Sequence, residues 1–154
     1  KVSADYHLCL SHNTRKRVNK LVQRQRMKRG AFLKLAGTSP QGQTMIIQQG
    51  TRLICRLEQC KNHMWNSQLL TVTGFDQKDV QLKCDDTERV YTMHHSFIAE
   101  KTHLGYCFTI ASAQGRTLNG SVAIWDTRHP HFSKRHLFTC LSRARQACLV
   151  SIQD

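Results

Sequence analysis

Short apolar runs that alternate with helical segments constrain both ends of the chain. Runs of four to six apolar residues suit buried strands, and strands that alternate with helices form parallel sheets with helices on their faces. The segments with these patterns are strands at 6–10, 105–110, 121–126 and 148–152, helices at 15–29 and 134–145, and a turn with a helical start at 112–118. The apolar residues expected to face the core from the two helices are Val18, Leu21, Val22, Leu137, Phe138 and Leu141. The two ends therefore predict one α/β domain, over residues 1–42 and 101–154.

The middle of the chain has a different pattern. Short β-like segments separated by turn residues follow one another at 51–59, 68–76, 79–85 and 89–95. Several short strands at spacings near ten residues are typical of a small antiparallel barrel. We predict such a β-barrel over residues 43–100, inserted into the α/β domain.

Positive charge is concentrated near the amino terminus. The chain has 23 Lys and Arg against 10 Asp and Glu, for a net charge of +13, and residues 1–34 hold ten of these basic residues against one acid, Asp5. Such a run is either the solvated face of a helix or a surface that follows phosphates, because each neutralised phosphate releases condensed counterions. A polyanionic partner is expected, and both interpretations of the run stay open.

Seven cysteines are present, an odd number, and four of them lie in apolar runs where a thiol packs as a small hydrophobe. This favours free thiols in a reducing, intracellular compartment over a disulfide framework. Cys55, Cys60 and His63 lack the paired spacing of a zinc knuckle, so no metal site is predicted. We also expect no signal peptide and no membrane span, and because the chain begins with Lys1 we expect a piece of a larger protein.

Three polar turns follow predicted strands, at 11–14, 109–115 and 126–133. Ligands collect at the carboxyl ends of parallel strands, where loops meet helix amino termini. Arg143, near the end of a predicted helix, offers a fork of donors that suits a phosphoryl oxygen. The chain holds no phosphate-binding GxxxxGK[ST] loop, so we expect that it does not hydrolyse a nucleoside triphosphate alone.

These segments carry a resemblance to a known family. "FTIASAQGRTL" (108–118) resembles motif V and "LFTCLSRAR" (137–145) resembles motif VI of superfamily 1 helicases, nearest to the RecD-like and PIF-type group, superfamily 1B. "HLCLSHNTRKRVNKL" (7–21) is similar to motif IV of the same group. The segment 50–76 resembles the opening of the SH3-like insertion in that group. The order and spacing agree over essentially the whole chain.

The resemblance implies a RecA-like parallel sheet with helices on both faces, carrying an inserted small SH3-like β-barrel. It implies the second RecA-like domain of an ATP-dependent DNA helicase, with ATP and Mg²⁺ used by the intact parent and neither bound by this fragment alone. The implied partners are single-stranded DNA, the first RecA-like domain of the same parent, and a replication protein such as a primase. A viral helicase of this superfamily has a motif V that departs from the usual sequence in a similar way, so the resemblance also allows a viral origin.

The resemblance also implies roles for individual residues. Arg143 corresponds to the arginine finger, a catalytic role in the parent. The implied nucleotide-binding residues are Gln114, Gly115 and Arg15, and the implied DNA-binding residues are Asn13, Thr109 and Ser112, to which Trp65 is added as a base-stacking residue. Trp125 closes an apolar run and is expected in the core.

Two departures weaken this correspondence. Ala111, Ser112 and Ala113 replace the family's "HKS" before Gln-Gly, and Asn66-Ser67 replaces Asn-Gly in the insertion. Two other functions stay open: a nonenzymatic nucleic-acid-binding module, and a platform whose barrel docks a replication partner. A simple binding module gives no reason for Gln-Gly and Ser-Arg at strand and helix ends that flank one cleft, and this favours the motor.

Overall fold

The computed structural model describes residues 3–39, 41–59, 63–146 and 149–153. The chain divides into two compact units. The first unit comprises Lys1–Val22 and Tyr106–Asp154, and the second unit comprises Gln23–Gly105. Each unit has its own sheet and its own buried core, so each is described by itself.

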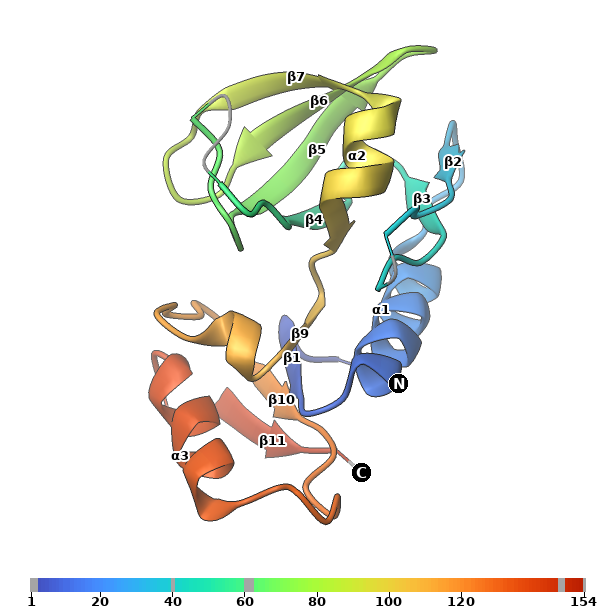
Figure 1. Ribbon diagram of the computed structural model, residues 1–154. Coiled ribbons are helices and arrows are strands. Elements are labelled where there is room, and N and C mark those ends of the chain that lie inside the picture. The colour runs from blue at the N-terminus through green and yellow to red at the C-terminus, as the bar shows by residue number, and fades with distance from the viewer. Residues whose placement is uncertain (1–2, 40, 60–62, 147–148, 154) are drawn as a thin grey trace. The chain divides into compact units, whose positions relative to one another are not determined.

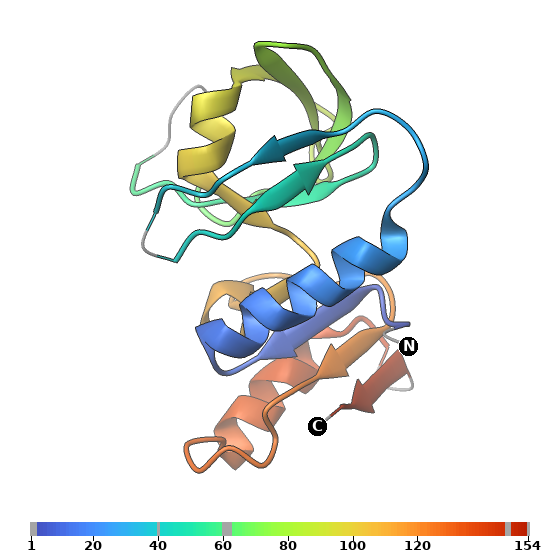
Figure 2. The same ribbon diagram turned by 90° about the vertical axis from the view of Figure 1, so that its right-hand side faces the viewer.

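The first unit is built on a parallel sheet, four-stranded over the described residues, with the strand order β11-β10-β1-β9. Helices α1 and α3 lie on opposite sides of this sheet (Figures 1 and 2), as expected for strands joined by helical crossovers. Leu8, Phe108 and Ile124 are almost completely buried in the sheet. The elements are β1 (Tyr6–Cys9), α1 (His12–Arg26), β9 (Cys107–Thr109), the 3₁₀ turn η1 (Ala111–Ala113), β10 (Val122–Ile124), α3 (Lys134–Arg143) and β11 (Val150–Ile152).

A buried amide fixes α1 against the edge of this sheet. The Asn19 side chain is fully buried, and its Oδ1 accepts hydrogen bonds from the N–H groups of Tyr106 (3.1 Å) and Cys107 (2.9 Å). Its Nδ2 donates to the Cys107 carbonyl at 3.1 Å. Because β9 is an edge strand, Asn19 supplies the partners that a further strand would otherwise provide.

The second unit contains an antiparallel sheet, five-stranded over the described residues, with the order β7-β6-β5-β4-β8. β7 alternates buried and exposed residues, which is the pattern of a sheet with one solvated face, whereas β4 and β8 are almost continuously buried. An antiparallel pair, β2 and β3, lies beside α2 (Figure 2), and the Thr38 N–H donates to the Ala99 carbonyl there. The elements are β2 (Leu33–Leu35), β3 (Met45–Ile47), β4 (Arg52–Cys55), β5 (Leu69–Phe75), β6 (Asp79–Cys84), β7 (Val90–His94), α2 (His95–Lys101) and β8 (Thr102–Leu104).

The predicted strands of both units are present, and the mixed α/β class with helices flanking a parallel sheet is confirmed. The unit boundaries fall at 22/23 and 105/106, whereas the sequence placed them at 42/43 and 100/101. Two pairings account for the difference. β2 pairs with β3, and β8 pairs with β4. The likeness of the second unit to an SH3-like barrel stays a prediction.

Two helical predictions were wrong in extent. The first helix ends at Arg26 rather than near Arg29, because Gln48 takes both the N–H and the C=O of Lys28 and draws the chain out of the helix. The helical start predicted at 112–118 is a single 3₁₀ turn, which gives way to Gly115 at φ +79°. Helix α2 and strands β2, β3 and β8 were not predicted.

Some residues expected in the core are exposed. Val18 and Val22 are buried as predicted, but Leu21 is 37% exposed and Phe138 is 72% exposed. Leu141 is 41% exposed, and helix α3 buries Cys140, three residues after the half-buried Leu137. Within the described ranges, no helix combines the length and the apolar character needed to cross a bilayer.

Replacing Asn19 by Ala should destabilise the first unit by about 3 kcal/mol, because it leaves two buried N–H groups and a carbonyl without partners. Chemical denaturation followed by circular dichroism measures this change. The matched control, Lys20→Ala, removes an exposed side chain of the same helix and should change stability by less than about 0.5 kcal/mol. Equal stability of the two variants would contradict the assigned role of Asn19.

Candidate functional site

The carboxyl ends of β1, β9 and β10 lie along one edge of the parallel sheet, because all the pairings in this sheet are parallel. The segments that leave this edge are 10–14 after β1, 110–115 after β9, and 125–133 after β10. Most of the predicted site residues of the first unit lie in these segments. The predicted clustering of polar turns at one edge is therefore present.

Asp126 holds the turn between β1 and α1. One carboxylate oxygen accepts hydrogen bonds from the N–H groups of Leu10 (3.1 Å) and Ser11 (3.0 Å), and the other accepts from the Thr14 hydroxyl at 2.6 Å. The Ser11 hydroxyl in turn accepts from the Thr14 N–H, which caps the first turn of α1. Asp126 itself has φ +64°, a left-handed conformation that Asp tolerates better than most residues.

Asp126 was expected in a polar turn, and no role was predicted for it. The available signal was an Asp directly after an apolar strand, in a sheet where the neighbouring strand also ends in hydroxyl residues. Burial alone would raise the pKa of Asp126, but the hydrogen bonds from Thr14, Ser11 and Leu10 outweigh it and hold the pKa below 3.8. The carboxylate is therefore ionised at neutral pH and organises this edge of the sheet.

The two predicted residues on α1 have different environments. Asn13 is exposed in the first turn, where its amide faces solvent. Arg15 is only 4% exposed, and its positive charge acts on the thiol of Cys107. Burial raises the pKa of Cys107, and the Arg15 guanidinium opposes that rise. The structure thus presents Asn13 at the surface and encloses Arg15.

The predicted pair after β9 forms a closed local contact. The hydroxyl oxygens of Thr109 and Ser112 lie 2.5 Å apart, and the Ser112 N–H donates to Thr109 Oγ1 at 3.3 Å. Thr109 is 7% exposed, whereas Ser112 is half-buried. The two hydroxyls satisfy each other and fix the start of the 3₁₀ turn, so Ser112 is the member of the pair that a ligand can reach.

The glutamine-glycine turn and the end of α3 are brought together by a short parallel bridge between Leu118 and Ala144. The Leu118 N–H donates to the Arg143 carbonyl at 2.8 Å, and the Arg145 N–H donates to the Leu118 carbonyl at 3.2 Å. Leu118 is only three residues beyond Gly115, a reach of about 11 Å at most. Residues separated by almost thirty positions in the sequence therefore lie in one neighbourhood.

The side chains in this neighbourhood are accessible. Gln114 and Gly115 are exposed, and Arg143 is half-exposed, with its Nε and Nη2 donating to the Ser142 hydroxyl at 3.3 and 3.2 Å. A Cβ at position 115 would meet no atom within 4 Å, so the requirement for glycine there is its φ of +79° rather than close packing.

The two tryptophans belong to different units. Trp125 is 8% exposed and its Nε1 donates to His7 Nδ1, so the prediction that it lies in the core is confirmed. Trp65 is 38% exposed in the second unit, where its backbone N–H donates to Gln68 Oε1. Trp65 therefore belongs to a different unit from the other predicted site residues.

Metal-binding groups are not assembled among the described residues, where no cluster of three His, Cys, Asp or Glu side chains could hold an ion. Cys60, part of the sequence motif considered for zinc, lies outside the described residues, as does Cys148. The five other cysteines are buried free thiols: Cys9, Cys55, Cys84, Cys107 and Cys140.

Comparison with known proteins identifies the relatives of this fold. The family model described as the viral superfamily 1 RNA helicase core domain matches residues 32–151. A solved structure of two coordinating Pif1 helicases at forked double-stranded DNA matches with a TM-score of 0.69 and 15% identity, over 97% of this chain and 39% of that one. A Pif1 helicase from Bacteroides, in complex with ADP-AlF₃ and single-stranded DNA, matches with a TM-score of 0.70 and 14% identity, over 97% and 40%.

A comparison with curated proteins gave no match. The chain spans about two fifths of the length of the solved structures that it matches, 39% and 40% in the two cases above. At these identities the likeness concerns the fold. It covers both units of the chain, because 97% of the residues are included.

Replacing Asp126 by Asn should destabilise the first unit by about 1 to 3 kcal/mol at pH 7, since the charge that accepts three hydrogen bonds is lost. The pKa of Asp126 is lowered in the folded state, so its stabilisation is complete above 3.8 and is lost as the pH falls through the folded-state pKa. The difference between the wild-type chain and Asp126→Asn should therefore shrink below pH 3.8. A difference that stays constant from pH 7 to pH 2 would contradict this role.

Proposed function

We propose that this chain, which belongs to the viral superfamily 1 RNA helicase core-domain family, is the carboxyl-terminal half of an ATP-dependent DNA helicase motor. In this proposal it is a second RecA-like domain with an SH3-like insertion. It supplies an arginine finger and part of a single-stranded DNA track, and it is inactive without a first RecA-like domain. The fold likeness to Pif1 helicases supports a helicase fold, and the match to only 39% and 40% of those chains supports a part of a motor.

One observation carries the proposal: the Leu118–Ala144 bridge, which holds the Gln114–Gly115 turn close to Arg143. A guanidinium with its fork of donors stabilises charge on a transferring phosphoryl group, and a glutamine amide with a neighbouring N–H suits the oxygens or water beside it. These groups are exposed or half-exposed, so a triphosphate held by a companion domain could reach them.

Magnesium does not fit this half of the motor. The described part of the first unit contains two carboxylates, Asp5 and Asp126. Asp5 is bonded to Ser121, and both oxygens of Asp126 accept hydrogen bonds from the β1–α1 segment. Neither offers the free oxygens that Mg²⁺ requires, so the ion and the phosphate-binding loop are assigned to the companion domain.

The nucleic-acid contacts are proposed from exposure and chemistry. Asn13 offers an exposed amide, Ser112 a half-buried hydroxyl, and Trp65 a partly exposed ring for stacking. Thr109 acts by fixing Ser112. A direct contact of Arg15 with nucleotide requires its buried side chain to move.

DNA rather than RNA is proposed because the solved Pif1 structures name DNA, although the family description names RNA. A primase-like replication partner and a viral origin are further proposals from the resemblance. A reducing, intracellular location is proposed from the free thiols.

The isolated chain should show no ATPase activity above background, with or without single-stranded DNA, because it lacks a phosphate-binding loop. A coupled phosphate-release assay on the purified chain measures this. Turnover that co-purifies with the chain and responds to mutation of Arg143 would contradict the half-motor assignment.

In a protein that joins this chain to its phosphate-binding domain, Arg143→Ala should lower the ATPase rate by about 10³- to 10⁵-fold, while DNA affinity stays nearly unchanged. Arg145→Ala is the matched control, since Arg145 is exposed two residues further along and should leave the rate within a few-fold. An unchanged rate in Arg143→Ala would remove the finger. Loss of DNA binding in that variant would instead favour the nonenzymatic binding module.

A further inference from the structure

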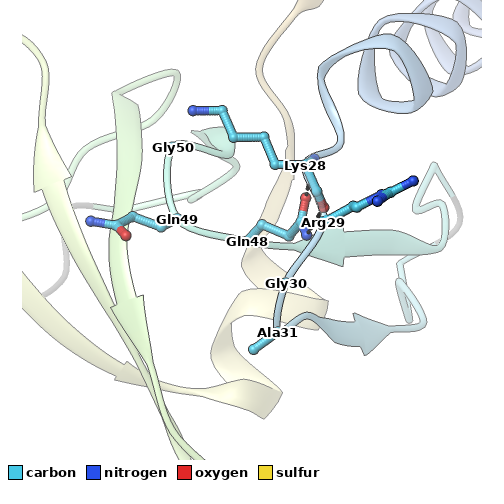
Figure 3. Close-up of a pocket in the computed structure, with 7 residues that line it drawn as sticks. All are labelled: Lys28, Arg29, Gly30, Ala31, Gln48, Gln49 and Gly50. Carbon is cyan, nitrogen blue, oxygen red and sulfur yellow. Dashed lines mark hydrogen bonds between the residues drawn. The ribbon is translucent and has the colours of Figure 1, made fainter.

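We propose that the second unit carries its own binding site for a single-stranded polynucleotide, in the pocket where the end of α1 meets the loop after β3. This inference rests on the proposed function for its nucleic-acid partner, and it assigns a contact surface separate from the sheet edge of the first unit. The pocket has a volume of about 540 Å³ and is lined by residues 28–31 and 48–50 (Figure 3).

The pocket is held in shape by backbone contacts. The Gln48 side chain accepts from the Lys28 N–H at 3.2 Å and donates to the Lys28 carbonyl at 2.9 Å, which ties the two lining segments together. The Gln48 N–H donates to Thr51 Oγ1, and the Gly50 N–H donates to the Val72 carbonyl. The loop after β3 is therefore anchored to β5, and both lining segments are held by hydrogen bonds within the second unit.

Two glycines line the pocket, and neither has a side chain that would occupy it. Gly30 has φ +142° and Gly50 has φ +85°, conformations that other residues rarely adopt. A Cβ atom at either position would meet no atom within 4 Å, so the space beside each backbone is open. Gln49 is exposed beside this open space, and its side-chain amide can donate to an anion there.

The charge of the lining selects a polyanion. Lys28 and Arg29 are exposed, and no carboxylate is found among the residues that line the pocket. In Figure 3 the Lys28 side chain extends over the Gln48–Gly50 loop, and Arg29 extends in the opposite direction. Two cations that point apart can neutralise successive phosphates better than they can grip one.

The surrounding sequence extends this charge well beyond one anion. Residues 6–57 contain no Asp or Glu, and Arg24, Arg26 and Lys34 are exposed on either side of the pocket. A free phosphate or a mononucleotide would use only part of this surface. A phosphodiester chain would use it along its length and would release a counterion at each contact.

An aromatic ring next to the pocket favours a single strand. Phe32 directly follows Ala31 of the lining and directly precedes β2, and it is 58% exposed. Lys34, within β2, is also exposed. An exposed ring that alternates with basic side chains suits unpaired bases, which stack on it irrespective of sequence. Paired bases inside a duplex do not offer their faces to such a ring.

The test is fluorescence anisotropy of labelled oligo(dT) and oligo(U) with the 154-residue chain over a range of salt concentrations. The double variant Lys28→Gln, Arg29→Gln should bind each oligonucleotide about tenfold or more weakly, and its log–log salt slope should fall by about 1.4. Phe32→Leu keeps an apolar side chain and should weaken binding about fivefold or more, with no change in slope. Circular dichroism verifies that each variant is folded.

The matched control is Lys78→Gln, Arg89→Gln, which removes the same charge from exposed positions of the same unit outside the pocket lining. If both double variants lose affinity and slope equally, the effect is general charge and the site is overturned. If the wild-type chain binds neither oligonucleotide, the site and the nucleic-acid part of the proposed function both fail. Binding of wild type with a selective loss in the pocket variants and in Phe32→Leu supports the site, and a preference for dT over U decides between DNA and RNA.

Discussion

The carboxylate of Asp126 is the interaction on which the candidate site depends. Each parallel strand ends in a loop whose N–H groups need partners, and the loop after β1 obtains them from the neighbouring strand, β10, through this one side chain. Thr14 adds a third bond and ties the first turn of α1 to the same anion. The position of Asn13 at the surface follows from this arrangement, since the turn that carries it has no freedom left.

The second constraint is the bridge between Leu118 and Ala144. The bridge explains how a glutamine-glycine turn and a serine-arginine pair, far apart in the sequence, come near one another. Leu118, which follows the turn, pairs with Ala144, which follows the serine-arginine pair. Gly115 makes this possible, because its positive φ ends the 3₁₀ turn and sends the chain toward α3. The bridge is therefore what places Arg143, at the end of α3, near the glutamine-glycine turn.

The sequence predicted those features that arise from local apolar pattern, and failed where a distant partner decides. Strands such as β1 and β6 are visible as apolar or alternating runs. The early end of α1 is not visible, because it depends on Gln48, twenty residues away, taking the backbone of Lys28. The exposed face of α3 at Phe138 was predicted to be core for the same reason, since periodicity indicates an apolar face but not what covers it. The role of Asp126 needed the strand order.

The distribution of charge joins these local arrangements to binding. Residues 6–57, a stretch of fifty-two residues, contain no Asp or Glu. Positive charges therefore lie near one another on α1 and beyond it, and like charges at helical spacing destabilise a helix. Buried amides offset part of that cost, since Asn19 and Gln23 hold α1 through backbone groups of β9 and β3 that carry no net charge. The exposed cations are then left to solvent and counterions. In the proposed binding, a polyanion replaces those counterions, relieves the repulsion and gains their release. This gain is largest where the acid-free stretch is most exposed, from the last turn of α1 to β2.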